Sequence, residues 1–247
     1  MKNIKLKLKN SLFNKVLEIF SHEKRGRVLD LGCGAGDYAN GLKTLGFDVV
    51  ASDRVKGTRY KYHGVIDFKA CDISEKLPFN NEEFDYVLFL ETIEHIWEPY
   101  FCIKEINRIL KKGGSLVIST PNILNINSRL RFLYEGSYDY FREPTLDYVN
   151  LYPDHLSNIH LIPWRYQNLE YLLSVNGLSV SNIYADILKA YLRVPYLFLL
   201  PIIKLQHYFK QKRVLKKGGI NYERIYAILN SDEILYGKHL ILKAVKE

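Results

Sequence analysis

The chain of 247 residues contains little cysteine and no long apolar run, and each absence excludes a class of protein. Its three cysteines, Cys33, Cys71 and Cys102, form no C-x-x-C pair, which argues against a disulfide framework and a structural zinc site. No stretch reaches the ~20 consecutive apolar residues of a membrane-spanning helix, and no apolar segment of signal-peptide length follows Met1. We therefore expect a globular protein of the reducing cytoplasm.

Charge of one sign is in excess. Lysine and arginine number 35 against 27 aspartate and glutamate, which gives a formal net charge of +8. Such a balance favours anionic partners such as nucleic acid, phosphorylated substrates or an acidic membrane surface. A genome whose base composition favours Lys, Asn, Ile and Tyr codons would produce the same excess, so charge alone does not choose a partner.

Short apolar segments alternate with helical patterns along most of the chain, which is typical of an α/β fold with a doubly wound parallel sheet. The predicted strands are 27–32, 47–53, 65–70, 84–90, 115–120, 178–184 and 238–245. The predicted helices are 12–21, 38–45, 99–110 and 166–175. We expect a single domain over 1–247, with a core of 24–122, 163–184 and 237–247 and a cap made by two insertions, 123–162 and 185–236.

A glycine-rich turn joins the first predicted strand to the next helix. Its sequence, Asp30-Leu-Gly32-Cys33-Gly34-Ala-Gly36, supplies glycine where backbone takes a positive φ or approaches a ligand closely. Doubly wound sheets bind ligands at such turns, outside the carboxyl ends of the strands. Because a carboxylate at Asp30 would repel a pyrophosphate, the turn favours a cationic or zwitterionic ligand.

Acidic residues follow the next two predicted strands. Asp53 ends the second strand about 17 positions beyond Gly36, close to the spacing at which a carboxylate accepts both hydroxyls of a ribose. Asp72 follows the third strand, where its side chain or the backbone of Ile73 meets an adenine edge. Each acid alone is typical of a cap or a solvated loop, but their joint placement after three consecutive strands favours a nucleoside ligand.

Further motifs give these features a family resemblance. They are Leu77-Pro-Phe, Phe84-Asp-Tyr-Val, Glu91-Thr-Ile-Glu-His-Ile, Leu110-Lys-Lys-Gly-Gly and Thr120-Pro-Asn. The sequence resembles class I S-adenosylmethionine-dependent methyltransferases over residues 27–122, in the branch of the ubiquinone-pathway O-methyltransferases and many sugar and natural-product methyltransferases. This resemblance implies a Rossmann-like sheet of seven strands with an antiparallel last strand.

The resemblance also implies S-adenosylmethionine as the cofactor. The glycines would let the methionine moiety pass close to backbone, Asp53 would hold the ribose, and Asp72 with Ile73 the adenine. The implied cofactor-binding residues are Asp30, Gly32, Cys33, Gly34, Gly36, Asp53, Arg54, Asp72, Ile73, Leu90 and Glu91.

Methyl transfer is an in-line displacement that depends on alignment, and it needs a general base only when the acceptor must lose a proton. His95 is the leading base candidate, with a loop brace as the alternative, and we favour a solvated loop position for Glu94 over an orienting one. Asn122 and His160 are further acceptor-site candidates, although a turn and a structural role are favoured for them. No metal is predicted, because His95, His155 and His160 have no recognised ligand spacing.

The two insertions bear on the acceptor. Aromatic residues crowd 132–152, and with Trp164 and Tyr166 they are expected to lie over the open side of the site, as a lid or as simple packing. In the second insertion an apolar run, 194–203, leads into a predicted helix after Pro201 with apolar residues on one face and lysines around them. That pattern fits contact with an anionic membrane surface, but we favour packing on the domain or on a second subunit.

We therefore predict methyl transfer to an oxygen of a small-molecule, saccharide or lipid-linked acceptor, in the cytoplasm or at the inner membrane surface. A nucleic-acid methyltransferase is disfavoured, because Leu90-Glu-Thr-Ile-Glu-His stands where exocyclic-base N-methyltransferases carry Asn/Asp-Pro-Pro-Tyr/Phe. A non-catalytic S-adenosylmethionine-binding protein stays open, as does a homo-oligomer. An NAD-dependent enzyme is disfavoured by the G-x-G-x-G spacing after Asp30.

Overall fold

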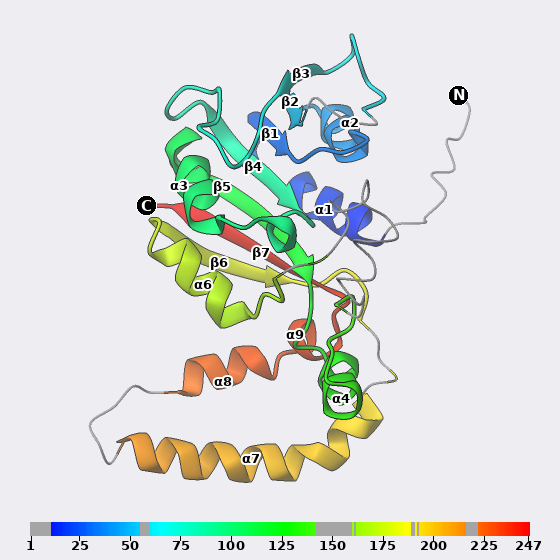
Figure 1. The fold of residues 1–247 in the computed structure, drawn as a ribbon, viewed down its shortest axis with the longest axis vertical. Helices are drawn as coiled ribbons and strands as arrows, with labels where there is room; N and C mark the ends of the chain where they lie inside the picture. The colour runs from blue at the N-terminus through cyan, green and yellow to red at the C-terminus, as the bar shows by residue number, and fades with distance from the viewer. Residues whose placement is uncertain are drawn as a thin grey trace.

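The computed structural model describes residues 11–54, 60–141, 160, 162–188, 191, 193–215 and 222–247. Seven strands form one sheet in the order β3-β2-β1-β4-β5-β7-β6 (Figure 1). They are β1 Arg27–Leu31, β2 Asp48–Asp53, β3 Asp67–Ala70, β4 Phe84–Leu90, β5 Leu110–Pro121, β6 Leu178–Tyr184 and β7 His239–Lys246. Because β7 pairs antiparallel with both neighbours and the other pairs are parallel, the predicted Rossmann-like fold is confirmed.

Helices connect the strands and build a cap. They are α1 Ser11–Ser21, α2 Asp37–Thr44, the short 3-10 helix η1 Ile93–His95, α3 Pro99–Ile109, α4 Ile126–Glu135, α6 Tyr166–Ser174, α7 Arg193–Leu215, α8 Glu223–Leu229 and α9 Asp232–Tyr236. None of the helices in the described residues is long and apolar enough to cross a membrane.

The central strands of the sheet are buried on both faces, because helices cover both sides and successive side chains of a strand point to opposite sides. In β4, Val87 and Phe89 join the core beneath α3 and α6, whereas Leu88 and Leu90 join the core beneath α1 and α2. This double burial explains why the strands are continuous apolar runs in the sequence. Their polar ends are left at the rims of the sheet, where a ligand site is possible.

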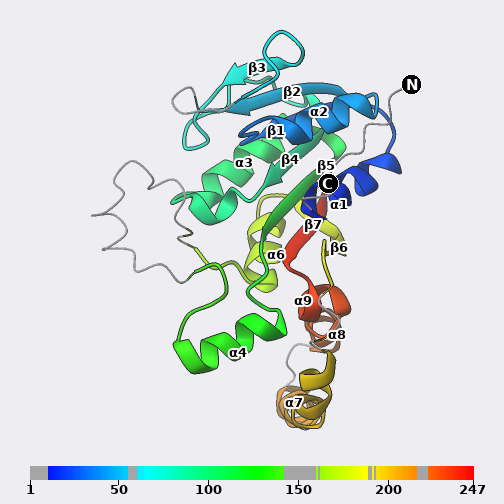
Figure 2. The same ribbon diagram turned by 90° about the vertical axis from the view of Figure 1, so that its right-hand side faces the viewer.

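The cap helices α4, α7, α8 and α9 gather at one end of the sheet, with α7 farthest from it (Figures 1 and 2). They fall within the segments predicted as insertions, 123–162 and 185–236. Tyr196 of α7 packs against Ile126, Leu235 and Tyr236 and so fixes α7 to α4 and α9.

Two expectations about the insertions are wrong. α7 does not begin after Pro201 but starts at Arg193 and contains the proline. Trp164 and Tyr166 do not belong to a lid, since both are buried in the core beneath α3 and α6. The Trp164 indole donates to the Ile93 carbonyl at 3.2 Å, which ties the start of α6 to the loop after β4.

The apolar face predicted for α7 exists but is not packed. Ile202, Leu205, Tyr208 and Phe209 are 65%, 57%, 57% and 59% exposed. We favoured packing on the domain or on a second subunit. Among the described residues this face does not pack on the domain, and packing on a second subunit stays a prediction.

Candidate cofactor and acceptor site

A cleft of about 540 Å³ opens at the carboxyl ends of β1, β2 and β4, a volume typical of small-molecule sites. Six of the expected cofactor residues line it: Gly32, Asp53, Arg54, Asp72, Ile73 and Glu91. His95, the expected general base, lines the same cleft. Part of the predicted cofactor set and the predicted base thus line one cavity.

The glycine-rich turn forms one wall of this cleft. Gly32 has φ +77°, and a Cβ there would lie 2.8 Å from the Thr92 hydroxyl oxygen, so no larger residue fits. The Gly34 amide donates to Asp53 Oδ2 at 2.7 Å, which holds the carboxylate of β2 against the turn. The other oxygen of Asp53 accepts from the Arg54 amide at 2.7 Å. Each carboxylate oxygen keeps a lone pair for a ligand hydroxyl.

Other expected cofactor residues are not among those that line the cleft, namely Asp30, Cys33, Gly34, Gly36 and Leu90. Asp30 is buried, and its Oδ2 accepts from the Ala39 amide at 3.0 Å in the first turn of α2. Burial raises the pKa of Asp30 to about 7, and the charge of Asp53 adds to this effect. Asp30 therefore braces the helix behind the turn.

The lining carries four carboxylates: Asp53, Asp72, Glu91 and Glu98. Asp72 accepts through Oδ1 from the Ser74 hydroxyl at 2.6 Å and the Ser74 amide at 2.9 Å, and these bonds lower the pKa of its carboxyl. Arg54 and His95 are the basic side chains of the lining. Acid is in excess here although the chain as a whole is basic, so the cleft suits a cationic ligand.

Trp97 is a lining residue that sequence analysis missed. Its side chain is 78% exposed at the cleft, between Ile96 and Glu98. A large exposed aromatic beside a cavity marks a stacking surface for a planar ligand group. The loop position after His95 gave no periodic signal that would have identified it.

A second missed feature is a pair, Asp186 and His239, on the acidic side of the site. His239 starts β7; its Nδ1 lies 2.8 Å from Asp186 Oδ2 and its Nε2 lies 3.5 Å from Glu91 Oε2. Although burial opposes ionisation of Asp186, hydrogen bonds from His239 and Ser11 and the charge of His239 hold the pKa of its carboxyl far below the usual value. The pair faces the carboxylate of Glu91.

Glu91 itself has an unusual backbone. Its φ is +46°, in the left-handed region that non-glycine residues rarely occupy. Its amide donates to the Ser119 carbonyl at 3.1 Å, and its Oε1 accepts from the Ser119 hydroxyl at 2.7 Å. These contacts keep the carboxylate at the rim between β4 and β5, and such strain is often retained at functional sites.

Glu94 is not the solvated loop carboxylate that we favoured. Its side chain is fully buried, and burial together with the charge of Glu91 raises the pKa of its carboxyl to about 8. The Ile162 amide, from a segment far along the chain, donates to the Glu94 carbonyl at 3.1 Å. Glu94 is therefore largely protonated at neutral pH unless a cation lies nearby.

His95 and His160 meet at Glu94. Their ring centroids are 4.9 Å apart, and His160 Nε2 lies 4.0 Å from Glu94 Oε1. His160 Nδ1 lies 2.6 Å from the Tyr140 carbonyl, an acceptor, so Nδ1 carries the proton and Nε2 presents a lone pair to the cluster.

One potential ligand atom from each of Glu94, His95 and His160 lies within 4.8 Å of the others, so these three side chains could hold a divalent cation. The sequence did not predict this arrangement. His155, the other histidine considered there, lies outside the described residues.

Asn122 is buried and fully engaged in the fold. Its Nδ2 donates to the carbonyls of Ile234 at 2.9 Å and Gly237 at 3.0 Å, and its Oδ1 accepts from the Leu124 amide at 3.0 Å. This geometry favours the turn over contact with an acceptor, and we omit Asn122 from the acceptor site. It joins the end of β5 to α9.

Comparison with known proteins bears on the family of this chain. Residues 29–118 match the family model described as "Methyltransferase domain". Over these residues, less than half of the chain, the sequence is similar to class I methyltransferases. This match confirms the predicted resemblance and S-adenosylmethionine as the cofactor that the family implies.

The methyltransferase domain also has curated relatives and solved neighbours. A ubiquinone biosynthesis O-methyltransferase of Bradyrhizobium diazoefficiens is 32% identical over 142 residues, 51% of this chain and 55% of the relative. A protein of the same name from Ruegeria sp. is 27% identical over 63% of this chain and 73% of the relative. The first match spans only about half the relative's length. A SAM-dependent methyltransferase from Archaeoglobus fulgidus has a similar fold, with a TM-score of 0.56, 17% identity and coverage of 95% and 94% of the two chains.

Proposed function

We propose that the chain transfers a methyl group from S-adenosylmethionine to an oxygen of a small-molecule acceptor. The observation that carries the proposal is the acidic cleft at the ends of β1, β2 and β4, lined by Asp53, Asp72 and Glu91 and containing His95. The sulfonium is a cation, so the carboxylates favour it over the neutral product left after transfer. The glycine turn leaves room for the methionine moiety.

His95 is the proposed proton acceptor. It lies in the cleft, and the buried Glu94 and His160 are packed next to it. A hydroxyl acceptor must lose its proton as the methyl group arrives, and a positioned base contributes about 10²–10⁴-fold to such a step. The Asp186–His239 pair would hold Glu91 in place from the other side.

The acceptor class is inferred from the cap and the relatives. The relatives are ubiquinone biosynthesis O-methyltransferases, which suggests a hydroxylated quinone precursor, and the exposed apolar face of α7 beside Lys212 and Arg213 suits an anionic membrane surface. Both favour a lipid-linked acceptor, with a saccharide as the second class. A non-catalytic cofactor-binding protein and a nucleic-acid methyltransferase are the competing functions.

Calorimetric titration with S-adenosylhomocysteine and with NAD tests the cofactor. Binding of the former alone is expected, and binding of NAD alone would end the proposal. Turnover is then measured as S-adenosylhomocysteine release with a polyprenylated catechol, an undecaprenyl-linked saccharide and a short duplex DNA. Release with neither of the first two would reject the acceptor classes named above.

The role of His95 is tested with His95→Gln. The control is His22→Gln, which changes an exposed histidine just after α1 that does not line the cleft. The expected result is a fall in kcat of about 10²–10⁴-fold with unchanged S-adenosylhomocysteine affinity. An unchanged kcat would exclude His95 as the base. Activity that is lost with EDTA and restored by Mg²⁺ or Zn²⁺ would instead assign Glu94, His95 and His160 as cation ligands.

A further inference from the structure

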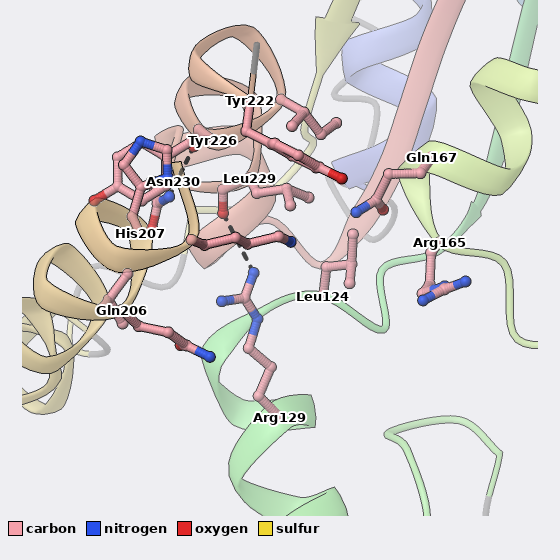
Figure 3. A pocket seen from close by; sticks show the side chains of 13 residues that line it. Leu124, Arg129, Arg165, Gln167, Gln206, His207, Tyr222, Tyr226, Leu229 and Asn230 are labelled. Carbon is pink, nitrogen blue, oxygen red and sulfur yellow. Dashed lines mark hydrogen bonds between the residues drawn. The ribbon is translucent and has the colours of Figure 1, made fainter. Parts of the chain in front are cut away.

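The cap contains a second cavity of about 360 Å³, which shares no lining residue with the cofactor cleft. It lies between α4, the start of α6, α7 and α8 (Figure 3). Its lining contains Arg129, Arg165 and Lys210 and, among the described residues, no aspartate or glutamate. We propose that this cavity binds a phosphate ester that carries free hydroxyl groups, such as a glycerol phosphate group.

Arg129 is the inner cation of the cavity. It is half-buried on α4, and its Nη2 donates to the Leu229 carbonyl at 3.3 Å (Figure 3). No carboxylate pairs with it in the part of the chain that the structure describes. Burial lowers the pKa of its guanidinium, but an arginine stays protonated at neutral pH. A partly buried charge without a counter-ion is costly, and a bound anion would remove that cost.

Arg165 and Lys210 supply two more cations from other elements. Both are exposed; Arg165 Nε donates to Asn168 Oδ1 at 3.1 Å, and Lys210 Nζ lies 4.4 Å from the ring centroid of Tyr222. Neither has a carboxylate partner among the described residues. A planar carboxylate can be satisfied by one guanidinium, whereas a tetrahedral phosphate offers oxygens to cations that approach from several sides. Cations from α4, α7 and the segment before α6 therefore favour phosphate.

Gln167 indicates which group the ligand carries in addition to the phosphate. Figure 3 shows its amide reaching towards the cavity from α6, and its Oε1 is buried with no hydrogen-bond donor among the described residues. Because phosphate oxygens cannot donate when ionised, a ligand hydroxyl is the group that satisfies this acceptor. The rings of His207 and Tyr226, stacked at 3.7 Å between centroids, form an adjacent wall for the carbon skeleton.

The full chain is titrated calorimetrically with glycerol 3-phosphate, inorganic phosphate and glycerol in 50 mM NaCl. We expect binding of the two phosphates and none of glycerol. Arg129→Gln should weaken both phosphates at least 10-fold, and Lys210→Gln about three-fold. Gln167→Leu should weaken glycerol 3-phosphate at least three-fold and leave inorganic phosphate within two-fold. The matched control is Lys204→Gln, which makes the same charge change on α7 outside the cavity lining and should leave both affinities within two-fold.

Two sources of the phosphate are separated with vesicles of phosphatidylglycerol and of phosphatidylcholine. Phosphatidylglycerol binding that glycerol 3-phosphate displaces and Arg129→Gln abolishes assigns a lipid headgroup, whereas binding of soluble phosphates without vesicle binding assigns a soluble ester. If Arg129→Gln does not fold, Arg165→Gln and Lys210→Gln at exposed positions replace it.

The proposal is overturned if 10 mM glycerol 3-phosphate gives no heat, or if Lys204→Gln weakens binding as much as Lys210→Gln. S-adenosylhomocysteine titrated in parallel reports the cofactor cleft, so failure of the cap site and failure of the proposed methyl transfer are distinguishable.

Discussion

The two cavities of this molecule differ in charge and in the elements that build them. The cofactor cleft lies at the ends of parallel strands and carries four carboxylates, whereas the cap cavity lies between helices and carries Arg129, Arg165 and Lys210. The net charge of the chain, +8, has the same sign as the charge of the cap cavity and the opposite sign to that of the cofactor cleft. Ligand chemistry in this chain is therefore decided by local groupings of side chains, and the following experiments test that contrast.

Among the binding and stability experiments, the largest effect is expected from Asp53→Ala. Loss of the ribose-binding carboxylate should weaken S-adenosylhomocysteine about 10–100-fold, about 1.4–2.7 kcal/mol, because hydrogen bonds to a charged group are the strong ones. Calorimetry checks this, with Asp48→Ala at the opposite end of β2 as the control. Binding of glycerol 3-phosphate should not change. A loss below two-fold would contradict the assigned role of Asp53.

Asp186→Asn tests the Asp186–His239 pair, which faces the carboxylate of Glu91. The depressed pKa of Asp186 stabilises the fold above the ordinary aspartate pKa of about 4, and that stability is lost as the pH falls through the folded value. The variant should therefore be less stable at pH 7, by about 1–2 kcal/mol, and this difference should be smaller at pH 3, where part of the linked stability is lost. Urea unfolding at both pH values measures the gap, and Asp232→Asn, an exposed position, is the control. A difference in unfolding free energy that is larger at pH 3 than at pH 7 would contradict this prediction.

Glu94→Gln tests the buried carboxyl beside His95. Because its pKa is raised to about 8, the stability linked to this group is full below about pH 4.5 and is lost as the pH rises through 8. Glutamine removes that dependence. Relative to the wild type, the variant should gain about 1 kcal/mol between pH 5 and pH 8.5, a shift in Tm of about 2–4 °C. Thermal unfolding measures it, with the exposed Glu75→Gln expected to show no such gain.

The smallest effect is expected from salt, which should weaken ligand binding at the cap cavity more than at the cofactor cleft. Raising NaCl from 50 to 500 mM screens the exposed Arg165 and Lys210, so glycerol 3-phosphate should bind about three-fold more weakly. S-adenosylhomocysteine has no net charge and should change less than two-fold. Equal salt dependence in parallel titrations would mean that the cavities do not differ as described.

The parallel core was predictable because its signals are local. Apolar runs gave the strands β1, β2 and β4 to within a residue or two, and glycine turns gave the cofactor edge. β5 begins earlier than expected, at Leu110, because this residue pairs with Phe84 across the sheet. That pairing is tertiary and overrides the helix-stop pattern of the following lysines and glycines.

The missed features depend on long-range contacts. Asp186 and His239 are far apart in sequence and meet only because β6 and β7 pair antiparallel. Glu94 is tied through its backbone carbonyl to Ile162, which is distant in sequence. The cap helices α8 and α9 are too short for a clear period, and packing against neighbours rather than intrinsic propensity stabilises them.

The reversed direction of β7 has a mechanical consequence. Since it runs against β5, its first residue, His239, lies at the rim, and the chain reaches that rim directly from α9 through Gly237. The Asn122 side chain donates hydrogen bonds to the carbonyls of Ile234 and Gly237 in the same segment. Only Gly237 and Lys238 lie between the end of α9 and the imidazole that faces Glu91, so the cap is attached to the cofactor cleft by a very short backbone connection.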